Sequence, residues 1–395
     1  MLAHPIRLPS YQVEQASKKY KAYDQRLLRE LILLQIPGCG PQSRARLIER
    51  FESLEQAFAC DPKSWPIKLT AAITYQLFEQ SGELYDKAHA CIDWCEHNGI
   101  SILHADHDAY PSAMQTIDAP PPVLFAKGNL ALLTLPAIGI VGTRHPSQSG
   151  LNTTRDFASV LAGSGFTIVS GLAKGVDAIA HSAAMNVKGT TIAVLGTGID
   201  KQYPHCNRAI YDQMNKSNQL ILSEFWPGTI PSPKNFPRRN RLISALSLGV
   251  LVTEAAVKSG SLVTARYAAE QGKEVFAVPG SIHNPMAKGC HHLINQGAKL
   301  TQDAHELVQA ISPELQQFVE RIQTPSEESE QLSSNVCPTD AVTAQIFPFI
   351  GFDPVDLDTL VARSNLPVAQ ILEELTLLEL EGTIACENGG YLRVN

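Results

Sequence analysis

The sequence predicts an α/β protein built on a doubly wound parallel sheet, and three observations lead to this prediction. From residue 137 onwards, short apolar runs alternate with segments of helical length. Parallel strands need crossover connections, which helices usually provide. The apolar runs are continuous, as is typical of strands buried on both faces. The composition, with 44% hydrophobic and 18% charged residues, is that of a globular protein and excludes collagen-like and wholly disordered chains.

The first hundred residues are predicted to be mostly helical. Residues 27–35 carry a periodic apolar pattern, residues 36–40 (Ile-Pro-Gly-Cys-Gly) predict a tight turn, and residues 43–51 predict a second helix. This pattern resembles a helix-hairpin-helix, whose turn presents backbone N–H groups to a phosphate. A plain αα-hairpin explains the same pattern equally well.

The central region contains the predicted sheet. A strand-like run at residues 100–104 and a Pro-rich stretch at 119–123 lead into it. Strands are then predicted at 137–141, 167–169, 191–195, 220–223, 249–253 and 274–278, with intervening helices at 150–162, 176–187, 207–216, 241–246 and 261–271.

The C-terminal part is predicted to be a linker followed by a winged helix. Residues 313–338 lack apolar periodicity and are acidic, so we expect a flexible linker. Short helices at 357–364 and 367–381 and a hairpin around Gly389-Gly390 follow. A winged helix usually reads DNA with a basic helix, but the second helix here carries four glutamates and no Lys or Arg. It therefore favours contact with a protein.

Membrane and disulfide-rich classes are excluded by pattern. The longest apolar run, residues 131–142, is interrupted by Thr134 and Pro136, well short of the ~18–20 residues of a membrane helix. No signal-peptide core follows the N-terminal lysines, so we expect a soluble, cytoplasmic protein. The eight cysteines have irregular spacing without a CxxC, which favours free thiols over disulfides or a metal site.

Charge is distributed unevenly along the chain. The whole chain has a formal net charge of −7, yet residues 137–311 carry 16 basic and 10 acidic side chains. Residues 338–395 carry 2 basic and 9 acidic side chains. A polyanionic partner is therefore expected to bind the central block.

Small, hydroxylated and basic residues follow the predicted strands. In an open parallel sheet, ligands bind outside the carboxyl ends of the strands, where the strand order reverses. Backbone N–H groups at helix N-termini, with Arg and Lys, can bind phosphates there. The candidate binding residues are Gly142, Thr143, Arg144, Ser170, Gly171, Lys174, Phe236, Arg238, Arg239, Asn240, Arg241, Ser259, Gly260 and Ser261.

The phosphates are predicted to belong to a polynucleotide. The sequence completes neither G-x-G-x-x-G nor a Walker A motif, so no nucleotide cofactor is expected. Phe236 stands beside Arg238, Arg239 and Arg241, a combination that binds single strands by stacking and charge.

These motifs resemble the DprA (Smf) DNA-processing family. The resemblance covers roughly residues 105–300, and its most specific part is the Phe-Pro-x-Arg-Asn-Arg segment at 236–241. The matching residues are Gly142-Thr143-Arg144, Ser170 to Asp177 with His181, Phe236 to Arg241, Ser259 to Thr264 with Pro279-Gly280, and Gly289 to Ile294 with Gly297-Ala298. Two positions depart from the family pattern: Ser149 stands where Tyr is common, and His291 where Asn is common.

The resemblance implies a domain plan and a function. It implies a SAM/helix-hairpin-helix-like domain at 1–104, an extended Rossmann-like DNA-binding domain at 105–312, the linker at 313–338 and a winged-helix-like domain at 339–395. It further implies a non-catalytic homodimer that binds and protects incoming single-stranded DNA and helps to load the RecA recombinase in natural transformation.

Two other functions are compatible with the residues. Related Rossmann folds hydrolyse nucleoside monophosphates, and Asp177, His181, Glu224 and Glu254 supply acid/base groups, although residues 257–264 lack the loop and glutamate of those enzymes. The protein could instead act mainly as an adaptor through its acidic linker and tail. We expect binding without catalysis.

Overall fold

The computed structural model describes residues 24–37, 39–67 and 81–323, together with residues 360, 361, 371, 375, 384–387 and 390–393. The chain divides into two compact units, Met1–Thr324 and Pro325–Asn395. Each unit is described by itself below.

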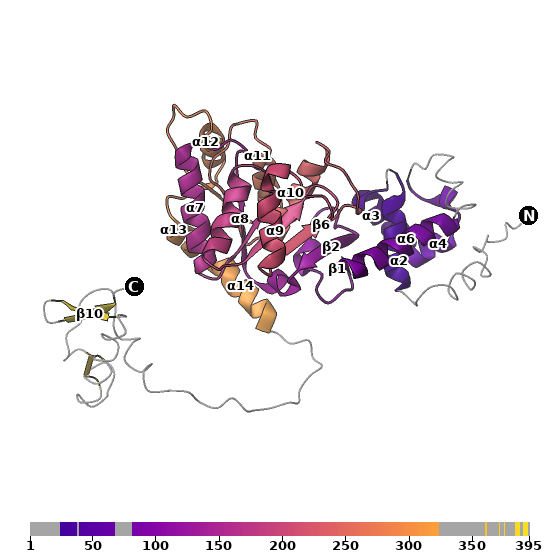
Figure 1. Cartoon of the computed structure of the whole chain (residues 1–395), viewed down its shortest axis with the longest axis horizontal. Helices are drawn as coiled ribbons and strands as arrows, with labels where there is room; N and C mark the ends of the chain where they lie inside the picture. Colours follow the sequence, from indigo (N-terminus) through magenta and orange to yellow (C-terminus); the bar gives the residue numbers. More distant parts are fainter. Residues whose placement is uncertain are drawn as a thin grey trace, which may run out of the picture. The chain divides into compact units, whose positions relative to one another are not determined.

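The first unit is built on a mixed nine-stranded sheet (Figure 1). Seven strands, from β6 to β9, are parallel, and β1 and β2 extend the sheet in antiparallel pairing beside β6. Successive strands run outward from β3 in one direction as far as β6, and then outward in the other direction from β7, so the order reverses between β3 and β7. Along the sheet the strands are β1 (Ile100–His104), β2 (Val123–Gly128), β6 (Leu220–Ser223), β5 (Thr191–Leu195), β4 (Thr167–Ser170), β3 (Ala137–Val141), β7 (Gly249–Val252), β8 (Glu274–Ala277) and β9 (Lys299–Leu300). The predicted doubly wound α/β fold is confirmed.

Helices cover both faces of this sheet. On one face α7 (Gln148–Gly163), α8 (Val176–Asn186) and α13 (Ala304–Ala310) share a core with β3 and β4. On the other face the core is formed with α10 (Asn235–Leu246), α11 (Ser261–Glu270) and α12 (Lys288–Asn295). Consecutive residues Ile168 and Val169 of β4 belong to these two different cores, as expected for a strand buried on both faces.

The N-terminal helices pack against the β1–β2 end of the sheet. They are α2 (Gln25–Gln35), α3 (Pro41–Phe51), α4 (Leu54–Ala59), the short η1 (Pro62–Ser64) and α6 (Ser81–His97). The fully buried Glu30 carboxylate of α2 accepts hydrogen bonds from Nε and Nη2 of Arg44 in α3, at 2.7 and 2.5 Å, which ties the two helices together.

The N-terminal helices and the sheet share one apolar core, which includes residues on both sides of residue 104. Leu31 of α2 and Ile92 of α6 belong to the same cluster as Phe125 of β2 and Tyr211 of α9 (Arg208–Lys216). The strand β1, placed before the predicted boundary, pairs with β2 along its whole length. The sequence analysis did not predict β2 or this pairing, because antiparallel strands need no crossover helix between them.

The predicted linker begins with a helix instead. Residues 313–323 lie within α14 (Ser312–Gln323), and Leu315 packs against the apolar core that includes residues of α7 and α13. Apolar residues at 315, 318, 319 and 322 have helical spacing, which the acidic composition of the segment obscured. The rest of the predicted linker lies outside the described residues.

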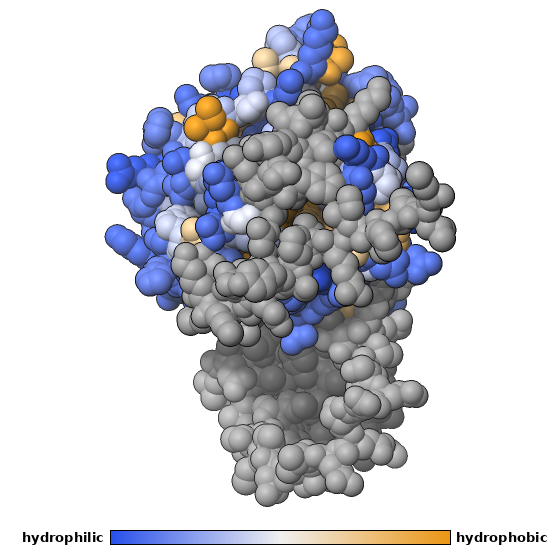
Figure 2. All heavy atoms as spheres, turned by 90° about the vertical axis from the view of Figure 1, so that its right-hand side faces the viewer, coloured by the Kyte–Doolittle hydropathy of each residue, from blue (hydrophilic) through white to orange (hydrophobic). Residues whose placement is uncertain are grey.

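The second unit contains the predicted hairpin. Strands β10 (Ile384–Glu387) and β11 (Gly390–Arg393) pair in antiparallel fashion. Most of the two predicted helices before it lies outside the described residues. Within the part of the chain that the structure describes, no helix has the length and apolarity needed to cross a membrane. On the face drawn in Figure 2, the coloured residues are mainly hydrophilic and the hydrophobic ones lie in small separate groups.

Candidate nucleic-acid interface

A crevice opens at the carboxyl ends of β3, β4 and β7, next to the point where the strand order reverses. It consists of a cavity of about 670 Å³ and an adjoining one of about 210 Å³, which share Arg144, His145, Ala173, Tyr203 and Phe236 as lining residues. We call these two cavities together the crevice. Of the predicted site residues, it is lined by Gly142, Thr143, Arg144, Gly171, Lys174, Phe236, Arg239, Asn240, Ser259, Gly260 and Ser261.

Close backbone approaches shape the wall formed by the loops after β3 and β4. Gly175, which precedes α8, has φ +77°, and a Cβ there would lie 2.5 Å from the carbonyl oxygen of Thr143. The Thr143 N–H in turn donates to the carbonyl oxygen of Glu254, at 2.7 Å. These contacts hold the loop that carries Arg144 against the ends of β4 and β7, so Arg144 projects from a fixed backbone.

An aromatic cluster lies in the crevice beside Arg144. The Arg144 guanidinium carbon is 5.5 Å from the centre of the Phe236 ring, and the Tyr203 ring centre is 5.9 Å from that of Phe236. Phe236 is half-buried, whereas Arg144 and Tyr203 are exposed. Tyr203 was not among the predicted site residues, because nothing in the sequence places the loop after β5 beside α10. The cluster offers planar surfaces on which a nucleobase can stack.

The charge of the crevice is positive. Arg144, Lys174 and Lys258 are exposed lining residues; Lys258 was not among the predicted site residues. Among the described lining residues the only carboxylate is Asp177, which is buried and accepts N–H bonds from Gly171 and Ala173 at 3.2 Å each. Burial raises the pKa of Asp177, and the nearby Arg239 opposes this effect. An anion entering the crevice therefore meets several cations and no exposed acid.

Arg239 forms part of the crevice wall rather than an exposed contact. It is 4% exposed, and its Nη1 donates to the carbonyl oxygens of Gly171, at 2.6 Å, and Val194. Burial lowers its pKa to about 10, so the guanidinium stays charged at neutral pH. Its role is to hold the ends of β4 and β5 and to add fixed positive charge behind the crevice.

Ser170 does not line the crevice. Its side chain is fully buried at the end of β4, and its Oγ donates to the carbonyl oxygen of Ile140 at 2.7 Å. The hydroxyl thus joins β4 to β3, and it has no exposed surface with which to contact a ligand.

Arg238 and Arg241 lie on the opposite side of α10 from the crevice. Both donate to the buried carboxylate of Glu224, at 3.1 and 2.5 Å, and both line a separate cavity. Their predicted place in the same site as Phe236 is wrong, for a geometric reason. The helix α10 begins at Asn235, six residues before its predicted start. Because successive helical residues are rotated by about 100°, Arg238 and Arg241 face away from Phe236.

The groups proposed for acid/base chemistry are occupied by structural contacts. The buried His181 ring shares a hydrogen bond of 2.7 Å between Nδ1 and Thr191 Oγ1, and burial lowers its pKa to about 3. The Glu254 carboxylate accepts the Ser147 N–H and the Asn284 side-chain amide, at 2.8 Å each. Asp177 and Glu224 have the partners given above, so the four groups serve as local supports in this structure.

The two positions that depart from the family pattern lie in helices α7 and α12. Ser149 is exposed in the first turn of α7. The half-buried His291 ring, through Nε2, is 3.0 Å from the carbonyl oxygen of Gly280 and so supports the loop after β8.

Two family models match the chain. The model described as "DNA recombination-mediator protein A" matches residues 101–312. The model described as "DprA winged helix domain" matches residues 330–390, which confirms the predicted winged helix.

Similar proteins cover most of the chain. The curated protein "Protein Smf" of Synechocystis sp. is 35% identical over 90% of this chain and 95% of its own length. "DNA processing protein DprA" of Streptococcus pneumoniae is 43% identical over 56% of this chain and 77% of its own length. The solved structure of Streptococcus pneumoniae DNA processing protein A has 35% identity and a TM-score of 0.57, and the match covers 72% of this chain and 97% of that one.

Proposed function

The chain belongs to the DprA/Smf family, and from this premise we propose that it is a DNA-processing protein that binds single-stranded DNA in the crevice without a catalytic step. The observation that carries the proposal is the cluster of Arg144, Phe236 and Tyr203 at the strand ends. Stacking surfaces beside cations suit exposed bases joined by phosphates, whereas a duplex keeps its bases stacked inside.

The position of the cations supports binding along a backbone. Lys174 follows β4, Arg144 follows β3 and Lys258 follows β7, so the three exposed cations come from three neighbouring strand ends. The adjacent backbone of residues 259–261 leads into α11, whose N-terminus is favourable for an anion. Phosphates of one strand can therefore be contacted from several elements at once.

The test is a salt titration with oligo-dT and with a duplex of equal length, followed by fluorescence anisotropy. We expect tighter binding to the single strand, and a log–log salt slope that falls by ~0.7 for each phosphate contact removed. Lys174→Ala should weaken binding and lower the slope, and the control Lys216→Ala, an exposed lysine outside the crevice lining, should change neither. Equal affinity of Lys174→Ala and wild type would contradict the proposal.

The finer parts of the proposal concern assembly and partners. The family resemblance and the description of the matching model as a recombination mediator support a cytoplasmic homodimer that protects incoming strands and helps RecA to load during transformation. Light scattering coupled to size-exclusion chromatography tests the dimer. RecA ATPase activity on strands covered by a single-strand-binding protein tests loading. If this protein loads RecA, ATP hydrolysis should begin after a shorter lag when it is present.

Two further measurements test the absence of catalysis and the role of the acidic tail. Purified protein incubated with AMP should release no adenine. Since residues 338–395 carry 2 basic and 9 acidic side chains, we propose that the winged helix contacts a protein. Deleting this region should therefore abolish binding of that protein partner and leave the affinity for oligo-dT unchanged.

A further inference from the structure

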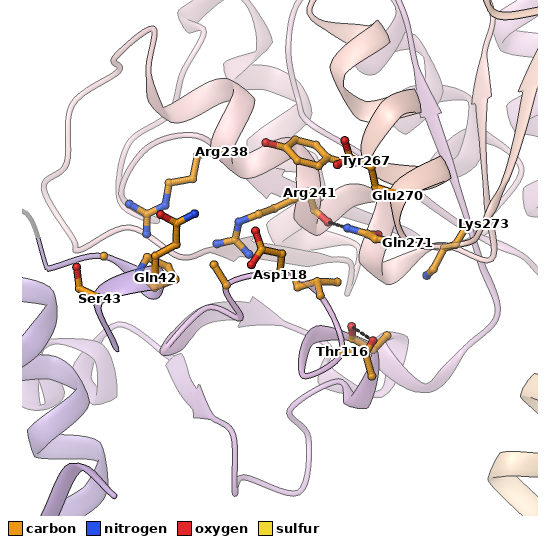
Figure 3. A pocket seen from close by; sticks show the side chains of 15 residues that line it. Gln42, Ser43, Thr116, Asp118, Arg238, Arg241, Tyr267, Glu270, Gln271 and Lys273 are labelled. Atoms are coloured by element: carbon orange, nitrogen blue, oxygen red, sulfur yellow. Dashed lines mark hydrogen bonds between the residues drawn. The ribbon is translucent and has the colours of Figure 1, made fainter. Parts of the chain in front are cut away.

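Another cavity, on the other side of α10 from the crevice, is not used by the proposed function. It has a volume of about 680 Å³ and lies between the first turn of α3, the loop around residues 113–119, and helices α10 and α11 (Figure 3). We call it the junction cavity. Its polar lining includes Gln42, Arg238, Arg241, Tyr267, Gln271 and Lys273.

Arg241 brings a buried, partly unsatisfied cation to this cavity. Its side chain is 8% exposed; one end of the guanidinium donates to Glu224 at 2.5 Å, while Nη1 is buried and has no hydrogen-bond partner among the described residues. Figure 3 shows the Arg241 side chain extending into the cavity. The Nε atom of Arg238 is likewise buried and without a partner in the described part of the chain. Buried charged donors are normally paired, so these atoms point to a missing acceptor.

The acceptor should carry negative charge. The buried Arg241 and the 36% exposed Arg238 share the single buried carboxylate of Glu224, which leaves an excess of one positive charge beside the cavity. Asp118 and Glu270 also line the cavity, but both are exposed and their charges are screened by solvent.

The N-terminus of α3 faces the same cavity. This helix has 11 residues and begins at Pro41; its N-cap residue, Gly40, has no side chain with which to cap it. Residues 40–43 all line the cavity. The positive end of the helix dipole therefore adds to the two guanidinium groups in favouring an anion.

We propose that the junction cavity binds a phosphate group between Arg238, Arg241 and the first turn of α3. The inference extends the proposed function, because α10 presents Phe236 to the crevice and Arg238 and Arg241 to this cavity. A strand leaving the crevice around the beginning of α10 brings a phosphodiester to the site. A free phosphate or nucleotide supplies the same chemistry, and the experiment separates the two sources.

The main variant is Gln42→Glu, in the first turn of α3. A carboxylate there repels phosphate, yet it is favourable at a helix N-terminus, so the fold is retained. The matched control is Gln56→Glu, another exposed glutamine, which lies in the first turn of α4 and does not line the cavity. A second variant, Arg238→Gln, removes one donor while Arg241 still pairs with Glu224.

The first arm measures oligo-dT affinity against salt for the full chain. If the phosphate belongs to the strand, Gln42→Glu and Arg238→Gln bind about tenfold more weakly than wild type, and Arg238→Gln lowers the salt slope by ~0.7. The Gln56→Glu control keeps wild-type values. Lys174→Ala, measured in the same titration, tests the crevice. Wild-type affinity of this variant would contradict the proposed function independently of the result at the junction cavity.

The second arm uses inorganic phosphate with the Arg144→Ala/Lys174→Ala protein, in which the crevice is weakened. If the site takes a free phosphate, phosphate raises the melting temperature above that in chloride of equal ionic strength, and adding Gln42→Glu removes the rise while Gln56→Glu does not. The proposal is overturned if Gln42→Glu and Arg238→Gln behave like the Gln56→Glu control in both arms.

Discussion

The replacement Phe236→Ala tests whether bases stack in the crevice. Phe236 is half-buried: one side of its ring lies against Gly196, where a Cβ would be 2.8 Å away, and Arg144 and Tyr203 lie beside it. Loss of a stacked base costs ~1–3 kcal/mol, which corresponds to roughly 5- to 150-fold weaker binding. The salt slope should stay unchanged because no charge is removed.

The same replacement also affects stability, and the two effects must be separated. A fully buried Phe→Ala change costs ~3–5 kcal/mol, so we expect about 2 kcal/mol of unfolding free energy for this half-buried ring. Phe236→Tyr keeps a planar ring and should bind nearly as wild type. Phe236→Leu keeps apolar contact without the ring, so it should stay folded and bind as weakly as Phe236→Ala. Wild-type affinity of the folded Phe236→Leu protein in the oligo-dT titration would refute the stacking argument.

Three further predictions follow from the structure. Arg144→Ala should weaken oligo-dT binding 5- to 150-fold and lower the salt slope by ~0.7 with an unchanged fold, since Arg144 is exposed; an unchanged slope would remove it from the phosphate contacts. Gly171→Ala should destabilise the protein, because a Cβ would lie 2.4 Å from the buried Arg239 guanidinium, whereas Gly163→Ala, with open space around it, should not; melting temperatures compare them. The pKa of His181 is about 3 in the folded protein and 6.5 in the unfolded chain, so below pH 6.5 unfolding is accompanied by protonation of this ring. The free energy of unfolding should therefore fall as the pH drops below 6.5, by ~1.4 kcal/mol per pH unit from this group. Denaturant titrations between pH 6.5 and 5 should show a shallower fall for His181→Asn than for wild type.

The sequence by itself determined the parallel part of the sheet and the strand ends at which the crevice lies. Continuous apolar runs separated by helical segments require parallel strands buried on both faces, so the strands from β3 to β8 were placed correctly. Parallel strands end at one edge, which is why Gly142, Lys174 and Ser259 were expected to meet there and do line the crevice. This reasoning needs only the period of the pattern and the direction of the strands.

Only the tertiary structure decided which way the side chains of α10 face. Residues 235–240 were expected before the helix, where no helical rotation separates their side chains, and this is how Arg238 and Arg241 were assigned to the crevice instead of the junction cavity. The pairing of Tyr203 with Phe236, and the burial of Arg239, likewise depend on contacts between segments distant in sequence. Local pattern fixes periodicity, whereas the direction and burial of a polar side chain depend on what the rest of the chain packs against it.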